Sequence, residues 1–376
     1  MPRMHVVVLG AGYAGIAATR RLESGLPEDV ALTLVDDTGE HEIQHEIHRI
    51  VRYPGLATDL RIPVDQLTSR AKPVKATVAA VNTETGLIEL ADTADLKADY
   101  LLVCLGAVSA EYDIPGIAAY GQPCKSVADA IDIHQQMADL PKDGQVVIGG
   151  AGLSGVQLAG EIGAYCQAEK QGSVVLLEQL GTVAPSFPDH FGRAIQTALA
   201  SYPVEVMTDS SIVGVDELNI SLDRGESIPY DRFIWTGGIR GPDAISGHRW
   251  AVNADLRVTD RTFVAGDAAA AIDERGEPIP AAAQTAVRAG RIAATNIIRL
   301  VEAADSDLVF EPRLDRYRYD PPGWFVSIGD ETIGLIGEQV VTGSAASAAK
   351  ATVGAGYLTS IGKIDHAIAQ VRSKMQ

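Results

Sequence analysis

The sequence predicts an α/β fold with parallel sheets, and three features carry this prediction. A β-branched strand runs into Gly-x-Gly-x-x-Gly and an Ala-rich helix at residues 5–20, and the same pattern returns at 145–161. Each helix is followed by an apolar strand that ends in an acid, and each half also holds an apolar strand that ends in glycine. We therefore expect two Rossmann-like dinucleotide-binding domains, one inserted in the other, plus a small C-terminal segment.

The first glycine pattern consists of Gly10, Gly12 and Gly15. Gly10 allows the tight turn, Gly12 lets the backbone approach a pyrophosphate, and Gly15 lets the helix pack closely on the strand. Backbone N–H groups and the positive helix end then favour the anion. The next strand, 31–36, ends in Asp36, and a carboxylate there can accept hydrogen bonds from ribose hydroxyls.

The second pattern repeats these roles with Gly150, Gly152 and Gly155, and its second strand ends in Glu178. The alternative for each acid is an ordinary surface carboxylate that closes a strand. The repetition favours two dinucleotide sites, and an acid at the ribose should repel a 2′-phosphate. The second site is therefore predicted to prefer NAD(H).

Length and charge limit the remaining possibilities. The chain has 376 residues with 46% hydrophobic content, enough to bury the cores of two or three domains. Its formal net charge of −18 argues against binding to nucleic acid, whose phosphates would be repelled. No apolar run approaches the roughly 18 residues needed to span a bilayer.

The three cysteines, Cys104, Cys124 and Cys166, are widely spaced. This spacing argues against a zinc knuckle, an iron–sulfur cluster and a short-range redox disulfide, and it fits a reducing compartment. Cys104 lies inside an apolar run and is predicted to be a small buried hydrophobe.

Three histidines, His41, His45 and His48, would share one face if their segment were helical. Such spacing can bind a metal, but no further ligand set is evident. Polar cover over a cofactor, or an internally hydrogen-bonded helix, is the preferred interpretation, and no metal site is predicted.

The rest of the chain alternates strands and helices. A hairpin is expected over 75–90, with its loop at 82–86, and the apolar strand after it ends at Gly106. The matching strand in the second half ends at Gly238. A later strand ends in Gly266-Asp267 and should return to the first sheet, placing Asp267 at the edge where such sheets hold ligands.

A helix is predicted over 280–298, with Pro280 in its first turn and Gln284 close behind. Its N-terminus could stabilise negative charge on a reduced cofactor. Beyond it, strands are expected near 324–328 and 332–336, then a Gly/Ala/Ser-rich stretch and a helix over 363–375. The expected organisation is a first dinucleotide domain at 1–111, a second at 112–245, the first resumed at 246–320, and a C-terminal segment at 321–376.

These motifs together resemble the two-dinucleotide-domain flavoproteins, and within them the type II NADH dehydrogenases. The residues that carry the resemblance are the two glycine patterns, Leu-Gly-Ala, Trp-Thr-Gly-Gly, Val-Ala-Gly-Asp and the Ala-Gln-x-Ala helix. The resemblance implies FAD at the first site, with Asp267 on the ribityl chain, and NADH at the second. The cofactor-binding residues implied are Gly10, Gly12, Gly15, Asp36, Gly106, Gly266, Asp267 and Gln284 for FAD, and Gly150, Gly152, Gly155, Glu178 and Gly238 for NADH.

The implied activity is that of a non-proton-pumping respiratory NADH:quinone oxidoreductase. Glu161 matches an acid that the family keeps near the nicotinamide and flavin, and Glu161 or Gln284 could relay protons. A carboxylate without a chemical role is the alternative for Glu161. One departure stands out: the family's quinone-side helix reads Ala-Gln-x-Ala-x-Gln, whereas Arg288 replaces the last glutamine. Arg288 could pair with an acid, contact a quinone or exclude it.

The expected partners follow from this activity: a quinone or other electron acceptor, an anionic membrane surface, and a second copy of the chain in a homodimer. From residue 341 onward the sequence contains four basic residues and one acidic residue. This excess of positive charge favours contact with an anionic surface. The alternative is that the last helix packs on the body of the protein. The basic residues are Lys350, Lys363, Arg372 and Lys374. The expected location is cytoplasmic, peripheral on the inner face of the cell membrane.

Three other functions stay open. A sulfide:quinone reductase would use a cysteine pair near the flavin, and no cysteine follows Cys166. A soluble NADH-dependent reductase could serve a protein or small-molecule acceptor. A flavoprotein that senses NADH and recruits a partner is the third alternative.

Overall fold

The structure, a computed structural model, describes residues 4–91, 93–304, 310–363 and 366. The chain divides into two compact units. Unit 1 comprises 1–42, 61–108 and 240–321, and unit 2 comprises 43–60, 109–239 and 322–376. Each unit is built on a parallel sheet flanked by helices, so the predicted α/β class with two dinucleotide-type domains is confirmed.

The sheet of unit 1 has five strands in the order β20-β9-β1-β2-β5, all parallel to their neighbours. The strand before Gly266-Asp267, β20, thus returns to the first sheet, as predicted. Both faces of the central strands are buried, which explains their continuous apolar sequences. The strands are β1 (Met4–Leu9), β2 (Val30–Asp36), β5 (Lys72–Lys75), β9 (Tyr100–Val103) and β20 (Thr262–Val264).

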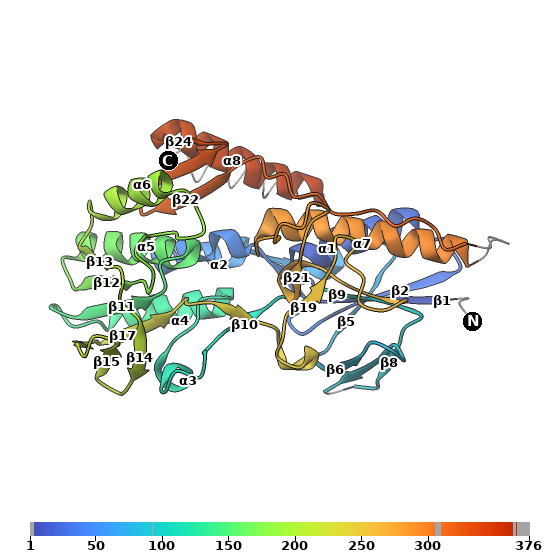
Figure 1. The fold of residues 1–376 in the computed structure, drawn as a ribbon, viewed down its shortest axis with the longest axis horizontal. Coiled ribbons are helices and arrows are strands. Elements are labelled where there is room, and N and C mark those ends of the chain that lie inside the picture. The colour runs from blue at the N-terminus through green and yellow to red at the C-terminus, as the bar shows by residue number, and fades with distance from the viewer. Residues whose placement is uncertain (1–3, 92, 305–309, 364–365, 367–376) are drawn as a thin grey trace. The chain divides into compact units, whose positions relative to one another are not determined.

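Two helices of unit 1, α1 (Tyr13–Gly25) and α7 (Ala283–Ala303), lie side by side (Figure 1). A Cβ on Gly290 of α7 would lie 2.2 Å from the carbonyl oxygen of Ala14, so only glycine allows this approach. The predicted position of Pro280 in the first turn is wrong, because α7 begins at Ala283. The Thr285 hydroxyl instead lies 2.7 Å from the carbonyl oxygens of both Pro280 and Ala282, and its single proton can bond either one to close the turn before the helix.

The remaining strands of unit 1 form small sheets. The predicted hairpin is confirmed: β6 and β7 pair in antiparallel fashion, and the Asn82 side chain accepts hydrogen bonds from the N–H groups of Glu84 and Thr85 in its turn. The elements are β3 (Glu40–Glu42) with β4 (Arg61–Pro63), β6 (Val78–Asn82) with β7 (Leu87–Leu90) and β8 (Leu96–Lys97), and β19 (Trp250–Val252) with β21 (Ala269–Ala271). Short 3-10 turns are η2 (Val64–Gln66), η3 (Asp243–Ile245) and η4 (Gly266–Ala268).

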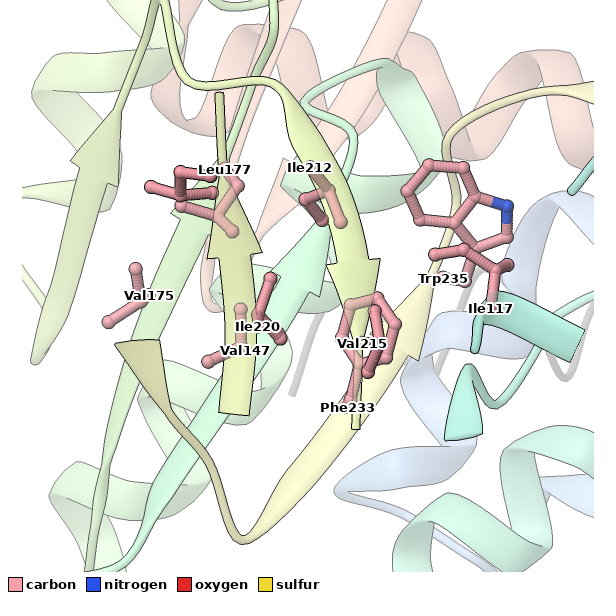
Figure 2. Packing of buried hydrophobic residues seen from close by; sticks show 10 residues of the cluster. Ile117, Val147, Val175, Leu177, Ile212, Val215, Ile220, Phe233 and Trp235 are labelled. Atoms are coloured by element: carbon pink, nitrogen blue, oxygen red, sulfur yellow. The ribbon is translucent and has the colours of Figure 1, made fainter. Parts of the chain in front are cut away.

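The sheet of unit 2 has four parallel strands in the order β13-β12-β11-β17. A three-stranded antiparallel sheet covers one face, and the buried side chains between them include Val147, Ile220 and Trp235 (Figure 2). Truncation of one such side chain to alanine typically costs about 2–5 kcal/mol. The strands are β11 (Gln145–Gly149), β12 (Ser173–Leu177), β13 (Val204–Met207) and β17 (Arg232–Trp235), covered by β14 (Ile212–Val215), β15 (Asn219–Leu222) and β16 (Ser227–Pro229).

Segment 43–60 groups with unit 2, although the sequence analysis assigned it to the first dinucleotide domain. Its 3-10 helix η1 (Gln44–Val51) packs on α4 and α5. His134 of α4 donates from Nδ1 to the Val51 carbonyl at 2.9 Å and fastens the segment. The helices of unit 2 are α2 (Leu56–Asp59), α3 (Ile117–Tyr120), α4 (Val127–Ala138), α5 (Leu153–Glu169), α6 (Asp189–Leu199) and α8 (Gly343–Ser360), and short strands β10 (Val108–Ser109) and β18 (Ile239–Arg240) mark the unit boundaries.

The C-terminal part of unit 2 is an antiparallel sheet followed by α8. Its strands are β22 (Trp324–Ile328), β23 (Glu331–Ile336) and β24 (Gln339–Thr342), in the positions predicted for the first two. The Gly/Ala/Ser-rich stretch forms α8, a helix that was not predicted. It forms because its many alanines favour helix more than its glycines oppose it. The helix predicted over 363–375 lies outside the described residues, apart from 363 and 366. In the described part of the chain no helix could cross a membrane.

Candidate functional site

The first glycine turn has the geometry that the sequence predicts. Gly10 has φ +97°, a conformation that L side chains rarely adopt, and its N–H donates to Val35 at 2.7 Å. A Cβ on Gly15 would lie 1.8 Å from the Gly10 carbonyl oxygen. At Gly12, by contrast, a Cβ would have no neighbour within 4 Å. The turn is therefore closed where helix meets strand and open where a diphosphate would approach.

Asp36 follows directly from this turn. Its Oδ2 accepts a hydrogen bond from the Ala11 N–H at 2.8 Å, and its Oδ1 accepts from the N–H groups of Thr38 and Gly39. The carboxylate is thus fixed at the carboxyl end of β2, beside the start of α1. Its remaining lone pairs are suited to ribose hydroxyls.

The second turn has nearly the same backbone conformation and hydrogen bonds as the first. Gly150 has φ +98° and donates to Leu177 at 2.8 Å, and a Cβ on Gly155 would lie 1.9 Å from the Gly150 oxygen. Gly152 is as open as Gly12. Glu178 is 6% exposed, and its Oε2 accepts from the Ala151 N–H at 2.8 Å.

Open space at the middle glycine, a fixed acid at the next strand and a helix N-terminus are the features that a dinucleotide diphosphate and ribose require. Each unit supplies all three from its own residues. The residues of both sites thus fit the cofactors that the sequence analysis assigned to them.

Further predicted residues lie at the same edge of each sheet. In unit 1 Gly106 has φ +67° with open space around its Cβ position, and Gly266 has φ +74° and abuts Ala14 of α1. Asp267 follows in η4, where Arg249 donates to its carbonyl at 2.8 Å. Parallel topology brings these strand ends to the edge that holds Gly10.

Gln284 is the second residue of α7, and Arg288 lies one turn later. The Arg288 guanidinium donates to the Asp320 carbonyl and interacts with the Tyr317 phenol. Arg288 thus fastens the segment after α7 to this helix, and its predicted roles toward a quinone stay predictions.

In unit 2 Gly238 follows β17, and its carbonyl accepts from the Ala110 N–H at 3.0 Å. The buried indole of Trp235 donates to the Ala110 carbonyl at 2.7 Å. These contacts fix the strand end beside the second glycine turn, because Gly237 borders the Cβ position of Gly150 at 2.9 Å.

The three histidines do not form the helical face predicted for them. His41 lies on β3, where it pairs with Ile62, and only His45 and His48 lie on η1. Pairing with β4 takes His41 into a strand. Among the residues described, no group of three or more His, Cys, Asp or Glu side chains could hold a metal ion.

His41 has a defined place under the first glycine turn. Its side chain is 0% exposed, its Nδ1 lies 2.8 Å from the Ala11 carbonyl, and its ring meets Tyr13 edge-on at 5.2 Å. Because a carbonyl only accepts, Nδ1 carries the hydrogen. Burial lowers the pKa of His41 to about 4, so the ring is neutral near pH 7. His41 therefore supports the turn as a neutral donor.

Glu161, on α5, lies in a buried group of charged side chains in unit 2, here called the buried charge cluster. Its Oε2 is 3.5 Å from Nε of Arg52 and has no hydrogen-bond partner among the described residues. Nearby, Lys350 of α8 donates to Ser327 at 2.7 Å and lies 3.7 Å from Oε1 of Glu46. The buried charge cluster comprises the buried Glu46, Glu161 and Lys350 and the partly buried Arg49 and Arg52. Arg52 also pairs with the exposed Asp330 at 2.7 Å.

The pKa of Glu161 is raised to about 7, because burial disfavours the carboxylate more than the cations Arg52, Arg49 and Lys350 favour it. A carboxyl group poised near neutrality can both donate and accept a proton at working pH. Burial and charge thus give Glu161 the properties of a proton-handling group.

Glu161 was predicted from the resemblance, whereas its neighbours Glu46, Arg52 and Lys350 become apparent as a group in the structure. One signal existed: Lys350 is the lone charge in the Ala-rich run that forms α8, and a buried lysine needs a partner. The structure also removes Lys350 from the basic tail predicted to meet a membrane, since it is 6% exposed and points into the buried charge cluster. Arg372 and Lys374 lie outside the described residues.

All three cysteines are free and buried, which confirms the prediction for Cys104. Burial raises the pKa of the Cys104 thiol far above its ordinary range, that of Cys124 to about 12 and that of Cys166 to about 11. The thiolate is the reactive form. These side chains are therefore poor nucleophiles.

Comparison with known proteins identifies this arrangement. A family model described as pyridine nucleotide-disulphide oxidoreductase matches residues 4–290. The type II NADH:quinone oxidoreductase of Staphylococcus saprophyticus is 24% identical over 387 residues, covering 93% of this chain and 94% of that protein. Its counterpart in Staphylococcus aureus is 23% identical over 404 residues, covering 96% and 97%.

Solved structures share the fold. NDH2 from Plasmodium falciparum in complex with NADH superposes with a TM-score of 0.83 at 14% identity, covering 99% of this chain and 98% of that chain. The sulfide:quinone oxidoreductase from Aquifex aeolicus gives a TM-score of 0.76 at 14% identity, covering 96% and 92%.

Proposed function

Because the chain belongs to the pyridine nucleotide-disulphide oxidoreductase family, we propose that it is an FAD-dependent NADH:quinone oxidoreductase. The observation that carries the proposal is the duplicated glycine turn. Each unit has an open middle glycine and a fixed acid, at Gly12 and Asp36 and at Gly152 and Glu178. Two such sites in one chain suit a bound flavin dinucleotide and a pyridine nucleotide substrate. Relatives named type II NADH:quinone oxidoreductase along almost the whole chain support the acceptor.

Unit 1 would hold FAD and unit 2 NADH. In unit 1, Gly10, Gly12 and Gly15 would receive the FAD diphosphate, Asp36 its ribose and Asp267 its ribityl chain, with Gly106, Gly266 and Gln284 along the same sheet edge. In unit 2, Gly150, Gly152 and Gly155 would receive the NADH diphosphate and Glu178 its ribose, beside Gly238. When bound, FAD supplies the redox chemistry, accepting a hydride from NADH and returning two electrons to the acceptor.

The balanced reaction is NADH + H⁺ + quinone → NAD⁺ + quinol, so one proton must be taken from solvent for each turnover. Glu161 is the group best suited to hold that proton, because its pKa is about 7 and its Oε2 is buried without a hydrogen-bond partner among the described residues. Arg52, at 3.5 Å, would stabilise the carboxylate after the proton leaves. Gln284 could orient the acceptor or a water molecule but carries no ionisable proton.

The properties of the cysteines argue against sulfide as the electron donor. Sulfide oxidation by this architecture would need a reactive thiol pair, whereas burial raises the pKa of all three thiols of this chain. A quinone is lipid-soluble, so we also propose peripheral contact with the membrane, carried by the chain beyond α8 rather than by Lys350. Self-association into a homodimer remains part of the proposal.

Steady-state assays of the purified holoenzyme test the proposal. NADH oxidation should accelerate with a short-chain quinone analogue, with one quinol formed per NADH consumed. Sulfide should not reduce the same quinone. Rapid NADH oxidation with a small iron–sulfur protein, and none with quinone, would replace the proposal with a soluble reductase.

A further inference from the structure

The loops that follow β12 and β13 are joined at the carboxyl edge of the unit 2 sheet. The Glu178 N–H donates to Met207 at 2.9 Å, the Ser210 N–H donates to Glu178 at 2.9 Å, and the Asp209 N–H donates to Leu180 at 3.1 Å. These three backbone hydrogen bonds hold the two loops as one surface. Glu178 itself is fixed by the N–H groups of Ala151 and Leu180.

Asp209 occupies an unusual backbone conformation on this surface. Its φ is +52°, in the left-handed region, and its side chain is exposed. Its carboxylate oxygens lie 3.3 and 3.6 Å from the position that a Cβ on Gly181 would take. The negative charge of Asp209 therefore sits over the loop that continues directly from Glu178.

This position matters for a nucleotide whose ribose binds at Glu178. A 2′-phosphate extends from the ribose toward the loop after the acid, where phosphate-accepting enzymes place an arginine. Here that loop, 178–188, and the adjoining segment, 207–211, contain no lysine or arginine. They contain instead a second carboxylate, Asp209, beside the first.

We propose that Asp209 is a second specificity-determining residue, which together with Glu178 excludes 2′-phosphorylated pyridine nucleotides. The inference rests on the proposed NADH site in unit 2. Glu178 accepts the ribose 2′-hydroxyl and cannot accept a phosphate in its place. Asp209 adds repulsion of the phosphate across the Gly181 loop without contacting the ribose.

The substitution Asp209→Asn isolates the charge, because asparagine tolerates the left-handed conformation as aspartate does. Asp143→Asn is the matched control. Asp143 is also exposed and in unit 2, but it precedes β11 and so lies at the opposite edge of the sheet. The probes are 5′-AMP and 2′,5′-ADP, which differ only in the 2′-phosphate, titrated by calorimetry into each holoenzyme.

In the wild type 5′-AMP should bind more tightly than 2′,5′-ADP. We divide the dissociation constant of 2′,5′-ADP by that of 5′-AMP. Asp209→Asn should lower this ratio about threefold to tenfold at low salt, and less at about 0.5 M salt, where exposed charges are screened. The kcat/KM ratio of NADH to NADPH should fall by a similar factor. Asp143→Asn should leave both ratios unchanged.

An Asp209→Asn ratio equal to that of the wild type, with 5′-AMP still bound, would overturn the inference and leave the proposed function standing. An equal change of the ratio in Asp143→Asn would overturn it as well, because the lower net charge alone would then explain the shift. If none of the proteins bound 5′-AMP, the nucleotide site itself, and with it the proposed function, would be refuted.

Discussion

The ammonium group of Lys350 lies 3.7 Å from Oε1 of Glu46, and both side chains are buried. Lys350 comes from α8 and Glu46 from η1, so one ion pair joins the C-terminal helix to segment 43–60 within unit 2. Removal of the Lys350 ammonium takes away one of the cations close to the buried Glu46 carboxylate, which keeps Arg49 at 3.1 Å. Such a loss is typically more costly than replacing both charges by neutral groups.

We expect Lys350→Met to lower the free energy of unfolding by about 1–3 kcal/mol, measured by chemical denaturation, because Glu46 keeps Arg49 as a partner. The double variant Glu46→Gln/Lys350→Met should recover part of this loss. Asp243→Asn, which breaks the exposed pair with Arg240, serves as the control and should cost less than about 1 kcal/mol. If the loss in free energy of unfolding of the double variant equalled the sum of the losses of the two single variants, the pair would not be coupled.

The pH dependence of catalysis should report Glu161. Its pKa is about 7, so the proton is present below that pH, and the rate of quinone reduction should fall as the pH rises through 7. Glu161→Gln should lower the rate and remove this inflection. Glu169→Gln, an exposed position on the same helix, should keep the wild-type profile. An unchanged inflection in Glu161→Gln would assign the titration to another group.

The same carboxyl group affects stability in a defined direction. Its pKa in the folded state lies above its ordinary value of 4.5, so it favours folding below pH 4.5 and ceases to do so as the pH rises through about 7. Thermal unfolding from pH 5 to 8 should therefore show a smaller loss of stability for Glu161→Gln than for the wild type. A steeper loss in the variant would contradict the raised pKa.

The middle and last glycines of the second turn should behave differently. Gly152→Ala adds a Cβ into open space, so the melting temperature and FAD content should be retained while NADH affinity falls about tenfold. Gly155→Ala places its Cβ 1.9 Å from a backbone oxygen and should destabilise the fold itself. Unfolding temperatures, flavin absorbance and NADH titration separate the two effects. Normal NADH affinity in Gly152→Ala would remove this turn from the site.

Acid should destabilise the protein through His41. Its pKa in the folded state is about 4 against an ordinary 6.5, so the unfolded chain binds the extra proton, and stability falls as the pH drops from 6.5 toward 4, by roughly 3 kcal/mol in all. His41→Asn keeps a donor toward Ala11 and should show a shallower decline in melting temperature over this range. The exposed His248 offers a control, since His248→Asn should leave the wild-type slope.

Much of this fold could be predicted from sequence because its signals are local. The glycine turns, the acids after the second strands and the buried parallel strands each depend on a few consecutive residues, and Gly10 and Gly150 adopt nearly the same φ. The placement of Asp36 and Glu178 followed from the same spacing. The helix α8 was not predicted, since its glycines and serines are typical of loops although its alanines favour helix.

The buried charge cluster could not be predicted, since its members come from three separate elements. Glu46 lies on η1 and Glu161 on α5, and these two helices pack together, whereas α8 packs on β23 and β24. The Lys350 side chain of α8 reaches Glu46 from there. His41 was misplaced for a similar reason: its pairing with β4 depends on residues about twenty positions later. Tertiary pairing of this kind overrides the local helical spacing of the three histidines.

The central claim is that one chain holds FAD and passes electrons from NADH to a quinone, and stopped-flow absorbance under anaerobic conditions tests it most directly. The purified protein should carry one FAD per chain, NADH should bleach the flavin band within the time of one turnover, and a quinone analogue mixed in next should restore the band. Bleaching by NADH without recovery on addition of quinone would contradict the account.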